Sequence, residues 1–146
     1  MASLRSILLL TLVGASALTL PCASFAQNAS ADGNAALAAA QALYKSGKWA
    51  QAIRAFEDFQ IRFPQHPEVA NIPYDIGEAQ VQLGEFEKAR TILSEYLDKA
   101  PDDERKALSL FRIGESSFFL NDYDRARKDL ETFRSLYPNH EKDSYA

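Results

Sequence analysis

The residues of this chain that could do chemistry are not spaced so as to assemble an active site. His66 and His140 are the only histidines. They occupy equivalent positions in two linkers, so we expect solvated loop residues that are too far apart to share a metal ion. Glu78 and Glu115 are the best pair for acid–base chemistry, but no nucleophile, phosphate-binding loop or metal cluster accompanies them. The sequence therefore predicts no enzyme, no metal site and no cofactor.

The first 26 residues have the composition of an export signal. Arg5 is their only charged residue, an apolar run follows from residue 7 to 20, and small residues precede the bond after Ala26. The run is shorter than a bilayer-spanning helix. We therefore expect a signal peptide over residues 1–26, a periplasmic or secreted mature protein, and no transmembrane anchor after cleavage. Cleavage after Ala23 and an uncleaved anchor are the alternatives.

Cys22 is the only cysteine, and it follows the apolar run where a lipid-modified cysteine would stand. Pro21 directly before it departs from the pattern of a lipoprotein signal, so we expect ordinary cleavage rather than lipidation. Removal of the leader leaves no cysteine, and the mature protein would then depend on no disulfide.

Charge and composition limit the partners of the mature chain. The 16 basic and 20 acidic residues are interspersed, which argues against the clustered basic surface that nucleic acids require. Residues 27–33 are small and polar without periodicity, and we expect a flexible tether there. The remainder is long enough for one domain, over residues 34–140.

Residues of five kinds recur at intervals of 37 along this domain. The turn residue is Gly47, then Gly84, then Asn121. It is followed each time by an aromatic residue, a small residue, an apolar pair and a proline: Trp49, Phe86, Tyr123; Ala52, Ala89, Ala126; Phe56/Phe59, Leu93/Tyr96, Leu130/Phe133; and Pro64, Pro101, Pro138. A common offset over five positions indicates an internal repeat.

Each repeat is predicted to be a pair of helices, over about 33–69, 70–106 and 107–140. Apolar residues of helical period lie on both sides of every turn residue. Gly and Asn tolerate the left-handed backbone that ends a helix, and the prolines end the second helix. One hairpin cannot cover its own apolar face, so the hairpins must stack. Small residues at Ala40, Gly77 and Gly114 would let the helices approach closely.

These small residues, the Gly-x-aromatic-x-x-Ala turn and the closing proline resemble the tetratricopeptide repeat. The resemblance implies an all-α fold in which three helical hairpins stack as a short right-handed α-solenoid, with a protein or peptide as the partner. The sequence departs from the common repeat in two ways. Its step is longer, and the tryptophan that is usual early in the first helix is replaced by Ala36, Pro73 and Leu110.

The aromatic-proline endings Phe63-Pro64 and Tyr137-Pro138 are similar to those of a subgroup found in bacterial envelope proteins. Examples are the TolA-binding cell-division coordinator and the lipoprotein of the outer-membrane β-barrel assembly machinery. This resemblance implies a role for the chain in envelope assembly or cell division.

In such a stack the first helices line the concave side, which is the predicted partner-binding surface. The repeat frame places aromatic, apolar and acidic residues there: Tyr44, Tyr74, Glu78, Val81, Phe111, Glu115 and Phe118. Aromatic rings would anchor a peptide or helix, and the carboxylates would select basic or hydrogen-bond-donating groups. The alternative for Phe118 and Phe119 is simple packing against neighbouring helices.

The last residues, 141–146, begin like a further first helix or a truncated tail. This leaves three possibilities for the apolar face of the third repeat, which includes Leu130 and Phe133. The face is open to self-association or to a partner, the sequence is part of a longer array, or the tail folds back over the face. We expect an exported adapter or scaffold. The competing interpretations are a docking region of a longer enzyme or sensor chain and a structural protein that oligomerises end to end.

Overall fold

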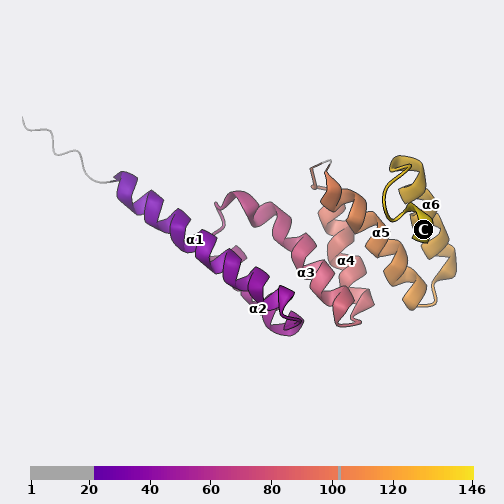
Figure 1. Cartoon of the computed structure of the whole chain (residues 1–146), viewed down its shortest axis with the longest axis horizontal. Coiled ribbons are helices and arrows are strands. Elements are labelled where there is room, and N and C mark those ends of the chain that lie inside the picture. The colour runs from indigo at the N-terminus through magenta and orange to yellow at the C-terminus, as the bar shows by residue number, and fades with distance from the viewer. Residues whose placement is uncertain (1–21, 102) are drawn as a thin grey trace, which may run out of the picture.

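The computed structural model describes residues 22–146 except Asp102, and this part of the chain is helical without strands (Figure 1). The helices are α1 (Cys22–Lys45), α2 (Trp49–Arg62), α3 (Ile72–Gln82), α4 (Phe86–Leu97), α5 (Glu104–Phe119) and α6 (Tyr123–Leu136), with short 3-10 helices η1 (Pro67–Asn71) and η2 (Asp143–Tyr145). The prediction of an all-α protein made of three helical hairpins is confirmed.

The hairpins follow one another side by side along the molecule (Figure 1). Each helix packs on the next one in the chain, and α3 also contacts α5. The array is therefore a short helical solenoid, in which the first helices of the second and third hairpins meet.

The three hairpin turns share one backbone geometry. Gly47, Gly84 and Asn121 have φ angles of 74°, 76° and 61°. The residue after each turn donates its backbone N–H to the carbonyl five residues earlier, over 3.0 Å from Lys48 to Leu43 and 2.9 Å in the other two turns. This arrangement satisfies carbonyls that the end of a helix would otherwise leave without a donor. The chain reverses at the residues that recur in the sequence.

Close packing of small residues holds the hairpins together. Ala52 and Ala89 are fully buried and Ala126 nearly so. A Cβ placed on Gly114 would lie 2.7 Å from Leu130 Cδ2, and one on Gly77 would overlap Leu93. In the second and third hairpins the second helix therefore packs closely against a glycine of the first helix, while the buried Ala40 holds this position in the first hairpin.

The N-terminal part of the structure differs from the expected tether. Residues 27–33 are not an irregular linker but belong to α1, which begins at Cys22. Alanine has the highest helix propensity and is frequent along α1 as a whole, and Gly33 is buried against Phe63 and His66. Residues 1–21 lie outside the described residues, so the signal peptide and its processing remain predictions.

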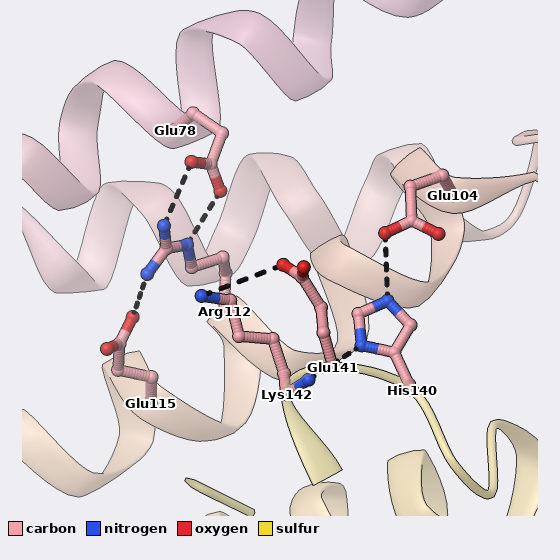
Figure 2. Close-up of polar contacts among 7 residues, drawn as sticks. All are labelled: Glu78, Glu104, Arg112, Glu115, His140, Glu141 and Lys142. Carbon is pink, nitrogen blue, oxygen red and sulfur yellow. Dashed lines mark hydrogen bonds and ion pairs between the residues drawn. The ribbon is translucent and has the colours of Figure 1, made fainter.

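The two histidines are not solvated loop residues, and that expectation was wrong. The rings of His66 and His140 pack edge-on against Phe59 and Phe133, with centroids 5.0 and 5.1 Å apart. Each Nδ1 accepts the backbone N–H two residues later. His140 Nε2 bonds to Glu104 at the start of α5 over 2.9 Å (Figure 2), and His66 Nε2 bonds to Asn34 within α1 over 3.0 Å. The histidines therefore tie each linker to its hairpin.

Residues 141–146 fold back against the third hairpin instead of starting a long helix. They contain η2, and Arg134 Nε donates to Asp143 Oδ1 over 3.1 Å. Ala146 packs on the core formed by Phe111 and Phe133. Of the outcomes considered for this segment, the described residues show the one in which it covers part of the apolar face.

Candidate functional site

Two hollows open on the face formed by α1, α3 and α5, here called the groove. The proximal hollow has a volume of about 270 Å³ and is lined by Gln41, Tyr44, Lys45, Phe56, Tyr74, Asp75 and Glu78. The distal hollow measures about 560 Å³ and is lined by Phe111, Arg112, Glu115, Phe118, Phe119, Leu130, Lys142, Tyr145 and Ala146. Six of the seven predicted partner-binding residues line these hollows, three in each; Val81 is half-buried on α3 and lines neither.

Arg112 joins the two predicted groove carboxylates to each other (Figure 2). Its Nε and Nη2 donate to the two oxygens of Glu78 over 2.8 and 3.2 Å, and its Nη1 donates to Glu115 Oε2 over 2.7 Å. The first pair is a two-pronged bond between α5 and α3, and it gives both strength and a defined orientation. We call these three residues the groove clamp.

The clamp compensates part of the negative charge that the sequence placed in the groove, since one guanidinium faces two carboxylates. Glu78 is only 8% exposed, so its carboxylate depends on Arg112 for charge compensation. Burial by itself would lower the pKa of Arg112, but the hydrogen bonds and charges of Glu78 and Glu115 outweigh it and raise that pKa. Arg112 therefore stays charged. Glu78 and Glu115 are therefore bound to Arg112. This differs from the expectation that they are free carboxylates that select groups of a ligand.

Sequence reasoning missed Arg112 although two signals pointed to it. It stands three residues before Glu115, a spacing at which helical side chains of opposite charge meet. It also lies nearly one repeat step after Glu78, on the neighbouring first helix. Arg112 contacts Glu78 because its side chain extends across the groove, and the sequence does not show that direction.

The proximal hollow is polar at its mouth and apolar at its floor. Phe56 in the floor is 1% exposed. Burial raises the pKa of Tyr44 and Tyr74, and the charge of Glu78 raises both further, so both phenols stay neutral at physiological pH. Burial also raises the pKa of Asp75, from 3.8 to about 6. Asp75 is a groove carboxylate that the sequence analysis did not single out.

The distal hollow carries exposed aromatic rings. Phe118 and Phe119 are 54% and 52% exposed. Phe119 stacks on Phe86 with centroids 4.6 Å apart, and Phe118 meets Phe119 and Tyr123 edge-on. The alternative of plain helix packing therefore holds only in part, because half of each phenylalanine side chain remains open to solvent.

The described residues form neither a metal site nor a membrane-spanning helix. Over residues 22–146 without Asp102, no group of three or more His, Cys, Asp or Glu side chains is placed to hold a metal ion. None of the helices there has the length and apolar character needed to span a bilayer.

Comparison with protein families agrees with the repeat geometry. Residues 37–104 and 108–140 match tetratricopeptide repeat profiles, and together they make up more than half of the chain. The chain belongs to the tetratricopeptide repeat family. Its repeats are typical of protein–protein interaction scaffolds, which generally have no catalytic role of their own. No curated protein matches the chain.

Proposed function

We propose that this tetratricopeptide repeat protein is an exported adapter that binds a segment of another protein along its groove. The observation that carries the proposal is the distal hollow. Phe118 and Phe119 expose more than half of their surface there, whereas Phe56, Phe59 and Phe133 are fully buried in the same array. Large aromatic side chains that stay exposed in a cavity are typical of interaction sites and of binding hot spots.

The chemistry of the hollow favours an apolar or aromatic anchor on the partner. Phe111, Leu130 and the two exposed rings supply apolar walls, while Lys142 and Glu115 bring opposite charges to the same hollow. A bound helix or extended segment would place one large side chain between these walls and keep its polar groups at the rim. The partner would therefore be recognised by an apolar residue in a polar surrounding.

Peptide selection tests this proposal. Peptides selected from a random displayed library against the purified protein should lose affinity by about tenfold or more in a Phe118→Ala/Phe119→Ala variant. Ile61→Ala is the matched control, because Ile61 is an exposed apolar residue on α2 that lines neither hollow. Equal binding to the double variant and to the control would overturn the proposal.

Export and a role in the bacterial envelope form the finer part of the proposal. They are supported by the composition of residues 1–26 and by the aromatic-proline endings of two repeats. Residues 1–40 fused to alkaline phosphatase in a bacterial host should produce enzyme activity outside the cytoplasm, with Gln27 as the new N-terminus. A fusion that stays in the cytoplasm would contradict export. Lipid attached to Cys22 would show that the leader is processed as a lipoprotein signal and not cleaved after Ala26.

A further inference from the structure

We infer that Asp75 receives a lysine or arginine side chain of the bound protein in the proximal hollow. This inference rests on the proposed function, because it assigns a partner chemistry to one end of the same groove. The occupant is the basic side chain of a peptide segment that continues toward the distal hollow.

The other groove carboxylates are engaged, which leaves Asp75. Glu78 and Glu115 both bond to Arg112. The Asp75 side chain makes no hydrogen bond and no ion pair within the described part of the chain, although the charges of Arg105, Glu68 and Glu78 act on it from a distance. Arg105 itself pairs with Glu68 and Asp103. A half-buried carboxylate without a direct partner gains most when a cation approaches it.

The shape of the hollow fits a long side chain that ends in a charge. Its volume of about 270 Å³ leaves room for an aliphatic stem against Phe56. The rings of Tyr44 and Tyr74 line the same hollow and offer faces to a cation, and Asp75 accepts its hydrogen bonds. Lys45 also lines the hollow, but it is an exposed residue at the end of α1, whereas Asp75 is half-buried beside the two tyrosine rings.

Proton binding to Asp75 provides an independent readout. Its pKa of about 6 means that the carboxylate is charged at pH 7.5 and mostly protonated at pH 5. A bound cation favours the charged form, so affinity should fall by roughly tenfold between these pH values. Asp75→Asn should remove this pH dependence. The titratable and charged groups that surround it remain in the variant: Tyr44, Lys45, Glu68, Tyr74, Glu78 and Arg105.

A displayed peptide library with Lys, Arg, Leu or Glu at one fixed central position provides the test. The purified protein should enrich Lys and Arg over Leu and Glu, and a selected Lys peptide without His, Asp or Glu should bind Asp75→Asn about tenfold more weakly. Asp98→Asn is the matched control, because Asp98 is exposed and lines neither hollow. Thermal unfolding establishes that each variant is folded.

The outcomes separate the two proposals. Peptides that lose affinity in the Phe118→Ala/Phe119→Ala variant but bind Asp75→Asn as well as the parent would overturn the cation site and leave the groove intact. Peptides that bind both variants normally would overturn the groove as well. Enrichment of Leu or Glu at the fixed position would also overturn the role of Asp75.

Discussion

The two hollows share several repeat positions, yet their chemistry differs. Tyr74 and Phe111 share one repeat position, and so do Asp75 and Arg112. In the proximal hollow the acidic residue has no direct partner, whereas in the distal repeat the same position carries the guanidinium of the groove clamp. The same repeated backbone arrangement therefore provides a polar, titratable hollow and an aromatic one. The side chains at shared repeat positions decide which kind of hollow forms.

The groove clamp lies between the hollows and belongs to both. Glu78 lines the proximal hollow, while Arg112 and Glu115 line the distal one. Because this contact connects α3 to α5, it also supports the stacking of the second and third hairpins. Groove charge and array stability are therefore linked through one arginine.

Loss of the clamp should have the largest effect. Arg112→Met leaves the buried Glu78 carboxylate without compensation, and we expect a decrease of about 3 kcal/mol in the free energy of unfolding. A Glu78→Gln/Arg112→Met double variant should recover most of that loss. Urea unfolding followed by circular dichroism measures both. Arg127→Met removes an exposed ion pair with Asp124 and is the control, which should change the free energy of unfolding little. Equal stability of Arg112→Met and Arg127→Met would refute the link between groove charge and array stability.

Glycine replacement should distinguish the two repeats at the level of packing. A methyl group at Gly77 meets the fully buried Leu93, whereas at Gly114 it meets the half-buried Leu130, which has room to turn. After the gain in helix propensity is included, we expect Gly77→Ala to cost about 2 kcal/mol and Gly114→Ala about 1 kcal/mol. Chemical denaturation measures the difference, and the reverse order would mean that Leu93 can move aside.

Asp75→Asn should stabilise the free protein at neutral pH. The pKa of Asp75 is 3.8 in the reference state and about 6 in the folded state, so the folded state binds its proton more tightly. The stability of the parent therefore declines as pH rises from about 4 to 6, and the variant lacks this decline. Since the side chain is partly exposed, we expect a gain of about 1–2 kcal/mol at pH 7. The free energy of unfolding of both proteins is measured across this pH range. The same pH dependence in the parent and the variant would contradict the raised pKa of Asp75.

Phe118→Ala should have the smallest effect on stability. The side chain is more than half exposed, so we expect a loss below about 1 kcal/mol, against about 3–4 kcal/mol for Phe133→Ala in the core. Thermal unfolding compares the two. Similar losses would show that Phe118 belongs to the core and would remove the contrast between buried and exposed aromatic residues.

Much of the fold could be predicted from the sequence because the determining interactions are local. Gly47, Gly84 and Asn121 end helices through their own backbone freedom, and a step of 37 residues repeats the hairpin. Because the same frame brings equivalent residues to one face, it also located six of the residues that line the hollows.

Contacts between distant residues were decided only by the tertiary structure. The sequence shows Glu78, Arg112 and His140 as charged or polar residues on helices and in a linker. Their partners depend on the direction of each side chain between neighbouring hairpins or on the return of a segment to its own hairpin. Burial and charge compensation arise only when those surfaces meet, which is why the repeat period determined the array while packing determined which carboxylate stayed without a partner.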